Sequence, residues 1–136
     1  MINSLLVSPD GQYLFVGAKW VRKYGVGSGQ LIGVLGEGET SSGVKCMRID
    51  WGYEYLISVH YDGSVILHQI FGEQTCKRYG GGEDSAVHWV EFIQDYEDFG
   101  YLLIDTGARL KKLSIPNFVE SSFGRSEKFR VETKKA

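Results

Sequence analysis

The sequence predicts an all-β protein made of four-stranded antiparallel β-propeller blades, because one pattern of strands and turns occurs three times. The copies begin at Ile2, Val44 and Val87, so they recur at intervals of 42 and 43 residues. A period of about 40–45 residues with four short strands is typical of a propeller blade. No stretch sustains a 3.6-residue apolar period, so no long helix is expected.

The first copy contains four runs rich in aliphatic and aromatic residues, which favour strands. They are Ile2–Val7, Tyr13–Ala18, Trp20–Tyr24 and Gln30–Leu35. A tight turn is predicted after the first run, because Pro9 presets φ, Asp10 can accept from its own backbone and Gly11 tolerates positive φ. The glycine-rich segment Gly25–Gly29 precedes a strand, whereas a phosphate loop needs a helix N-terminus, so we expect a hairpin turn there.

The second copy repeats this order, with a turn at Tyr61–Ser64. Its strand-like runs are Val44–Ile49, Tyr55–His60, Val65–Ile70 and Thr75–Tyr79. Cys46 and Cys76 both fall in these runs, and two cysteines are too few for a disulfide framework. We expect buried thiols of an intracellular protein, with a disulfide between the two as the alternative.

The third copy has a longer first turn, Gln94–Gly100, which carries Asp95, Glu97 and Asp98. Its strand-like runs are Val87–Phe92, Tyr101–Asp105, Leu110–Ile115 and Val119–Phe123. The three carboxylates are expected in a solvated loop, because general acid–base work requires burial and a partner. Their spacing also matches no calcium loop.

The division that follows is three blades within residues 1–123, at about 2–43, 44–86 and 87–123, and a polar basic tail at 124–136. The net charge of −2 and the isoelectric point of 5.9 give no overall attraction to nucleic acid or anionic membranes. No apolar run approaches the roughly 18 residues of a membrane span, and no secretory signal is visible. We therefore expect a cytoplasmic or nuclear protein.

Catalytic and metal-binding patterns are missing from the sequence. His60, His68 and His88 have no metal-ligand spacing, and there is no Cys-x-x-Cys. His88 alternates with Val87 and Trp89, which predicts that it points away from both. No serine lies in a G-x-S-x-G sequence. We expect no catalytic residue, no metal and no cofactor.

At three places the repeats resemble the WD40 family. VSPDGQYLFVGA (Val7–Ala18) is similar to that family's first strand, turn and second strand, and YLISVHYDGSVILHQI (Tyr55–Ile70) to its second strand, Asp-Gly turn and third strand. GSGQLIGVLGEG (Gly27–Gly38) resembles its fourth strand and exit loop. The resemblance covers residues 2 to about 123 and implies the propeller fold.

The repeats also depart from the WD40 pattern. Tyr24-Gly25, His68-Gln69 and Leu113-Ser114 stand where the family has Trp-Asp, and the Gly-His dipeptide is missing. Asp62 keeps the position of the family's turn aspartate without its usual histidine partner. We therefore do not expect the family's usual hydrogen-bonded network inside the blades.

Three blades form an incomplete ring, since closed propellers have roughly four to eight. Each blade buries its faces against its neighbours, so a row of three leaves two apolar faces open. Two copies could join into one ring, the chain could belong to a longer propeller, or another protein could supply the remaining blades.

The WD40 resemblance implies that turns between second and third strands share one rim with the inter-blade loops. Aromatic residues and arginine are frequent at interface hot spots. The candidate partner-binding residues on this rim are Lys19, Trp20, Tyr61, Asp62, Glu83, Asp84 and Arg109. The alternative for Trp20 is packing against its own blade, and the basic tail is expected to be solvated.

We therefore predict a non-enzymatic scaffold that binds a protein or peptide through its rim loops. The alternative is a small-ligand or catalytic site at the mouth of the completed ring, formed by polar groups of several blades such as Lys19, Asp105 and Arg109. Fold alone does not decide between them.

Overall fold

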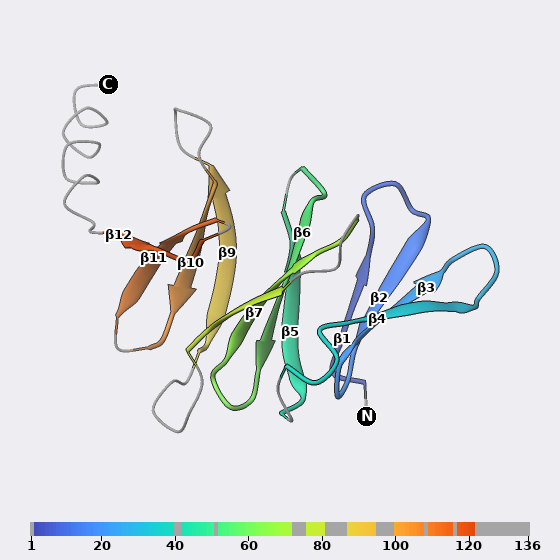
Figure 1. Cartoon of the computed structure of the whole chain (residues 1–136), viewed down its shortest axis with the longest axis horizontal. Coiled ribbons are helices and arrows are strands. Elements are labelled where there is room, and N and C mark those ends of the chain that lie inside the picture. The colour runs from blue at the N-terminus through green and yellow to red at the C-terminus, as the bar shows by residue number, and fades with distance from the viewer. Residues whose placement is uncertain are drawn as a thin grey trace.

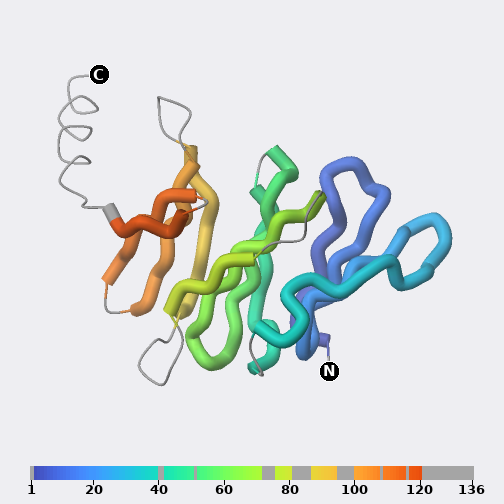
Figure 2. The backbone as a smooth tube through the Cα atoms, in the orientation of Figure 1, coloured from blue at the N-terminus to red at the C-terminus, as the bar shows by residue number. Residues whose placement is uncertain are grey.

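The chain folds into three four-stranded antiparallel sheets that stand side by side, as Figures 1 and 2 show. The computed structural model describes residues 2–39, 42–50, 52–71, 76–80, 87–94, 100–107, 109–115 and 117–121, and this part contains twelve strands and no helix. The prediction of an unclosed all-β propeller segment is confirmed. The predicted tail 124–136 and the acidic residues Asp95, Glu97 and Asp98 lie outside the described residues.

Each sheet keeps its strands in sequence order, because consecutive strands are joined as hairpins. Blade 1 consists of β1 (Ser4–Val7), β2 (Tyr13–Gly17), β3 (Val21–Gly25) and β4 (Leu31–Leu35). Blade 2 consists of β5 (Val44–Ile49), β6 (Tyr55–His60), β7 (Val65–Gln69) and β8 (Cys76–Tyr79). Blade 3 consists of β9 (Trp89–Gln94), β10 (Gly100–Asp105), β11 (Leu110–Ser114) and β12 (Glu120–Ser121). Every predicted run contains or overlaps one of these strands.

The turns follow from their residues. Gly11 has a φ of 74°, and the Asp10 carboxylate accepts hydrogen bonds from the Ser8 hydroxyl and from the Gln12 amide. The segment Gly25–Gly29 is a hairpin turn as predicted, with the Gly29 amide donating to the Gly25 carbonyl at 2.8 Å. These turns reverse the chain within a few residues and bring neighbouring strands into register.

The apolar core lies between the blades. Between blades 1 and 2 it contains Phe15, Val21, Leu35, Val44, Met47, Leu56 and Ile70. Between blades 2 and 3 it contains Ile57, Val59, Val65, Leu67, Val87, Val90, Phe92, Leu102, Ile104 and Leu113. Blade 2 is therefore covered on both faces, which is why β6 and β7 are buried along almost their whole length.

A buried polar chain crosses the middle of blade 2. Ser58 Oγ lies 2.8 Å from His60 Nε2 and 2.7 Å from His68 Nε2, and His60 Nδ1 lies 2.9 Å from the Ser42 carbonyl oxygen. Only a donor can face that carbonyl, so His60 Nδ1 is protonated and its Nε2 accepts from the Ser58 hydroxyl. His68 Nε2 then donates to Ser58 Oγ.

This chain of bonds is a feature that the sequence did not predict. The family's usual network was not expected, and blade 2 instead has a polar chain that contains His60 and His68, both buried in strands. His68 Nδ1 has no hydrogen-bond partner among the described residues. Burial, with a smaller contribution from His60, lowers the pKa of His68 to about 3, and burial also lowers the pKa of His60.

Blade 3 differs from expectation at Trp89. Val87 is buried and His88 is exposed, as predicted, but Trp89 is 50% exposed because β9 turns Val90 and Phe92 toward blade 2. Cys46 and Cys76 are free thiols, as expected, although each is half-buried and not fully buried. Burial raises the pKa of both thiols.

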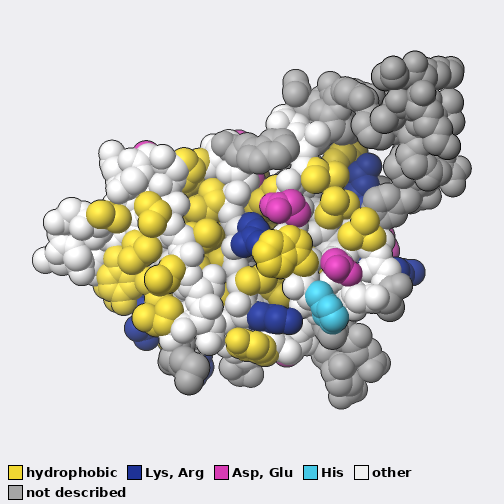
Figure 3. Space-filling view, turned by 180° about the vertical axis from the view of Figure 1, so that it is seen from behind, with side chains coloured by type: hydrophobic (Ala, Val, Ile, Leu, Met, Phe, Trp, Pro, Cys, Tyr) yellow, Lys and Arg dark blue, Asp and Glu magenta, His cyan; other side chains and the backbone are white. Residues whose placement is uncertain are grey.

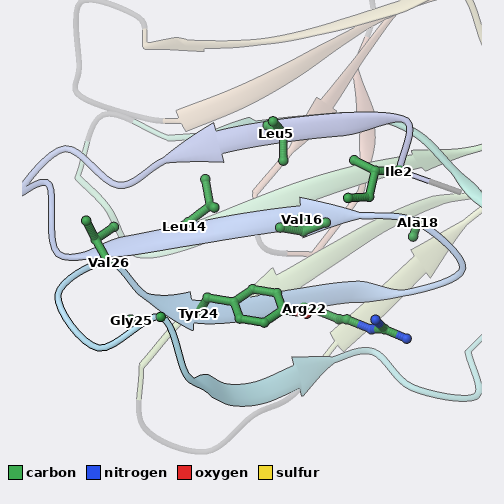
Figure 4. Close-up of a pocket in the computed structure, with 10 residues that line it drawn as sticks. Ile2, Leu5, Leu14, Val16, Ala18, Arg22, Tyr24, Gly25 and Val26 are labelled. Atoms are coloured by element: carbon green, nitrogen blue, oxygen red, sulfur yellow. The ribbon is translucent and has the colours of Figure 1, made fainter.

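Blade 1 leaves one face uncovered. This face has a hollow of about 430 Å³, lined by residues of the first three strands and their turns. Figure 4 shows these lining residues as sticks. Leu5, Val7, Val26, Leu31 and Ile32 of this blade are each more than half exposed. Figure 3 shows hydrophobic side chains gathered over blade 1. The segment thus presents the open apolar face that an incomplete ring requires.

Acid is expected to destabilise the fold through His68. The unfolded chain binds a proton near pH 6.5, whereas the folded chain, with the pKa of His68 at about 3, does not. Stability should therefore fall as the pH falls from about 6.5 to about 3, with a slope that corresponds to at most one proton taken up on unfolding by this residue. Urea unfolding at several pH values measures this dependence of the free energy of unfolding on pH. His68→Leu should flatten this dependence, and the exposed control His88→Gln should not. Identical slopes in the wild type and His68→Leu would contradict the assignment.

The contact of Gly17 with blade 2 yields a second prediction. A Cβ at Gly17 would lie 2.7 Å from Val44 Cγ1, whereas a Cβ at Gly33, also in a strand of blade 1, meets nothing within 4 Å. Gly17→Ala should therefore lower the free energy of unfolding by about 1–3 kcal/mol. Gly33→Ala should change it by less than about 0.5 kcal/mol. Chemical denaturation tests the pair, and equal effects would mean that blades 1 and 2 pack differently.

Candidate partner-binding rim

One edge of the segment carries the turns between the second and third strands of all three blades, along the lower edge in Figure 1. Lys19 and Trp20 lie in the β2–β3 turn, Tyr61 and Asp62 in the β6–β7 turn, and Arg109 in the β10–β11 turn. The structure therefore places all five on the edge that the sequence predicted. The candidates Glu83 and Asp84 lie outside the described residues.

The first two turns are tied together by the segment that enters blade 2. The Val44 amide donates to the Ala18 carbonyl at 2.6 Å, and the Tyr61 amide donates to the Gly43 carbonyl at 3.1 Å. The Asp62 amide donates to Ser42 Oγ at 2.9 Å. Because residues 42–44 bond to both turns, the surfaces of blades 1 and 2 are held in a fixed relation here. We call Lys19, Trp20, Ser42, Gly43, Tyr61, Asp62 and Arg78 the rim site.

The two aromatic residues of the rim site differ in exposure. Tyr61 is 61% exposed. Its ring lies near Gly43, since a Cβ added at Gly43 would be 3.8 Å from Tyr61 Cδ2. Trp20 is half-buried, its buried indole nitrogen has no hydrogen-bond partner among the described residues, and Lys19 Nζ lies 5.0 Å from its ring centre. Tyr61 is therefore the more accessible aromatic group of the two.

Asp62 shapes the β6–β7 turn and carries its charge. Its Oδ1 accepts from the Ser64 amide at 2.9 Å and from the Ser64 hydroxyl at 2.6 Å. Its other carboxylate oxygen lies 3.9 Å from Arg78 Nη2, and Arg78 Nη1 donates to the Glu39 carbonyl at 3.3 Å. The sequence interpretation missed Arg78, since a fourth-strand arginine gives no signal that it reaches a turn of the neighbouring hairpin.

Arg109 stands apart from the rim site. It forms an ion pair with Glu120 of its own blade at 3.2 Å, and blade 2 lies between it and Lys19. The Asp105 carboxylate accepts a hydrogen bond from the Gly107 amide at 2.8 Å and so stabilises the β10–β11 turn. The polar groups named for a site at the ring mouth thus belong to blades 1 and 3.

Comparison with known proteins addresses the fold. No family model matches the sequence, and no curated protein does. Among solved structures, the RRP9 WD40 repeats match with a TM-score of 0.72 and 23% identity over 89% of this chain and 37% of that one. U3-55K matches with a TM-score of 0.71 and 23% identity over 89% of this chain and 38% of that one. The Cps50 (Swd1) β-propeller domain of Myceliophteria thermophila matches with a TM-score of 0.68 and 9% identity over 90% of this chain and 40% of that one.

The chain has the fold of a WD40-repeat β-propeller. It spans about two fifths of the length of the solved propellers that it resembles. The twelve strands are thus the strands of three WD40-type blades, and the rim site lies on one edge of the WD40-type segment.

A second polar and aromatic group in this WD40-type segment escaped the sequence interpretation. The guanidinium carbon of Arg48 lies 4.0 Å from the ring centre of Trp89, and Arg48 Nε lies 3.9 Å from the Glu91 carboxylate. Figure 3 shows basic, acidic and hydrophobic side chains together near the middle of that view. The sequence could have predicted that Trp89 points outward if Val90 and Phe92 had been taken as the buried positions of β9, because side chains alternate between the two faces of a strand.

Three further observations concern metal sites, pockets and membrane-spanning segments in the described part of the chain. No three of its His, Cys, Asp or Glu side chains are grouped to hold a metal. A hollow of about 250 Å³ between blades 2 and 3 is lined by Asp50 and Glu54, but Asp50 Oδ1 accepts from the amides of Glu54 and Tyr55 as a turn cap. None of the described residues belongs to a helix that could cross a membrane.

The role of residue 42 in joining the two turns can be tested with a matched pair of serines. Ser42 Oγ accepts from the Asp62 amide between the blades, while Ser28 Oγ accepts from the Gln30 amide in an exposed hairpin. Ser42→Ala should destabilise the protein by about 1–2 kcal/mol and speed amide exchange at Asp62. Ser28→Ala should cost less than about 0.5 kcal/mol. Unchanged exchange at Asp62 would show that Ser42 does not hold this turn.

Proposed function

We propose that this protein is a non-enzymatic interaction scaffold that binds a protein or peptide through the rim site. The supporting observation is the exposed Tyr61 and the partly exposed Trp20, which lie on turns of two blades that backbone hydrogen bonds through residues 42–44 join. Rigid aromatic side chains contribute most of the affinity at many interfaces, because they bury a large area at low entropic cost.

The charges beside this pair suggest the character of the partner. Lys19 lies over Trp20, and Arg78 faces Asp62 at 3.9 Å, a long ion pair that leaves the guanidinium able to bind elsewhere. Lys19 and Arg78 would suit an acidic side chain of a bound segment whose apolar residue contacts Tyr61. Glu83, Asp84 and Arg109 belong to the proposed binding edge on the grounds of their sequence positions.

We further propose that residues 1–123 form the three-blade unit and 124–136 a tail, and that other blades complete the ring. Those blades belong to a longer form of the chain, to a partner or to a second copy. A cytoplasmic or nuclear location is consistent with the two free thiols. A ligand or catalytic site at the ring mouth, formed by groups of different blades such as Lys19 and Arg109, is the alternative.

Selection of peptides from a random display library against the folded protein tests the rim site. Tyr61→Ala should weaken selected peptides by about tenfold or more, equivalent to about 1.4 kcal/mol. Val26→Ala, an exposed apolar residue at the opposite edge, is the control and should leave the dissociation constant unchanged. Fluorescence anisotropy measures both.

Two results would count against this function. Peptides that bind equally to the wild type and to Tyr61→Ala would place the binding surface elsewhere. Saturable binding or turnover of a small molecule that Arg109→Ala abolishes would support the ring-mouth alternative.

A further inference from the structure

The three blades are equivalent position by position, which allows one interface to serve as a template for another. Each second strand has a tyrosine at the same place, at Tyr13, Tyr55 and Tyr101. Equivalent backbone bonds join Val26 to Gln12, Ile70 to Glu54 and Ile115 to Gly100. By the same register, Lys23 in blade 1 corresponds to Leu67 in blade 2 and to Lys112 in blade 3.

Blade 1 shows what covers this lysine position. Lys23 Nζ lies 4.2 Å from the ring centre of Tyr13 and 4.9 Å from that of Phe71 in blade 2. Tyr53 of blade 2 packs edge-on against Phe71, with ring centres 4.9 Å apart. Lys23 is only 8% exposed, and burial lowers its pKa against the opposing effect of Asp10. The next blade therefore closes over the lysine with aromatic side chains from its turns.

Blade 3 has the same lysine and tyrosine without a neighbour. Lys112 Nζ lies 4.2 Å from the ring centre of Tyr101, the same distance as in blade 1. Lys112 pairs with Leu103 across the sheet, on the face opposite the one that Leu102 and Leu113 bury against blade 2. Within the part of the chain that the structure describes, no second ring lies over Lys112. This face therefore has half of the arrangement seen around Lys23.

Blade 1 of a second copy does not fit this face, because it has no aromatic residues at the positions that cover Lys23. Phe71 follows Ile70, and the equivalent of Ile70 in blade 1 is Val26, so Gly27 stands at the place of Phe71. Tyr53 and Gly11 occupy the same turn position, both with positive φ and both donating three residues back along the chain. Blade 1 thus offers two glycines where the template requires two aromatic rings.

We propose that the free face of blade 3 binds a partner blade that carries an aromatic side chain at its first or third hairpin turn, and that this ring clamps Lys112 against Tyr101. A cation held between aromatic faces gains stability from both rings, and more so when water is excluded. This proposal rests on the proposed completion of the ring by other blades, but its surface lies apart from the rim site, so it and peptide binding at the rim site can fail independently.

The test uses the full chain extended after Ala136 by a copy of residues 42–80, because blade 2 carries both aromatic residues. Its matched control is the same extended chain with Phe71→Ala and Tyr53→Gly in the added copy alone. Lysine acetylation by an amine-reactive ester is followed by mass spectrometry. Lys77, which is exposed, and Lys23, which is buried, are the internal references.

The acetylation rate of Lys112, relative to Lys77, should fall about tenfold in the extended chain and recover in the control copy. Equal rates in both extended chains would overturn the proposal, provided that circular dichroism and protease resistance show the added blade to be folded in each.

The unextended chain provides a separate test that does not depend on the added blade. Lys112 should stay reactive up to about 100 μM, well above the Kd range of specific complexes. Protection that grows with concentration, together with a dimer in light scattering, would make a second copy the occupant and overturn the proposal. Protection in the monomer that disappears on truncation after residue 123 would assign the face to the chain's own C-terminal segment and would overturn it as well.

Discussion

The structure depends on one constraint, which is that a four-stranded blade buries its faces only against other blades. Blade 2 meets this condition within the chain, and its two central strands are accordingly buried almost throughout. Blades 1 and 3 each meet it on one side. The apolar hollow on blade 1 and the uncovered Lys112–Tyr101 pair on blade 3 are the two consequences of the same rule.

The fully buried blade is also the one with a polar interior. Ser58, His60 and His68 form a hydrogen-bonded chain that ends at the Ser42 carbonyl, next to the turn that presents Tyr61. Most buried polar groups in proteins are hydrogen-bonded, and the bonds of this chain fix the relation between the strands and the entering segment. The core of blade 2 and the rim site are therefore parts of one connected arrangement, in which the interior sets the geometry of the exposed turn.

The three blades differ in the residues that they carry at equivalent strand positions. At one position of the second strand the three blades have Val16, Ser58 and Ile104, and only Ser58 belongs to a polar chain. At the lysine position, blade 2 has Leu67 and packs it against blade 3, whereas the outer blades have lysines. Blades of the same architecture thus make different contacts with their neighbours, and a comparison of fold alone does not show these differences.

The sequence alone determined the twelve strands, the turns and the repeat, because local residue preferences and a 42–43-residue period survive without knowledge of packing. It also placed Lys19, Trp20, Tyr61, Asp62 and Arg109 on one edge, because turn position follows from strand order. Only the tertiary structure showed that His60 and His68 replace the missing network, that Trp89 faces outward, and that Arg78 reaches Asp62. Those facts depend on which side chains meet across strands and between blades, and sequence spacing contains no record of such distances.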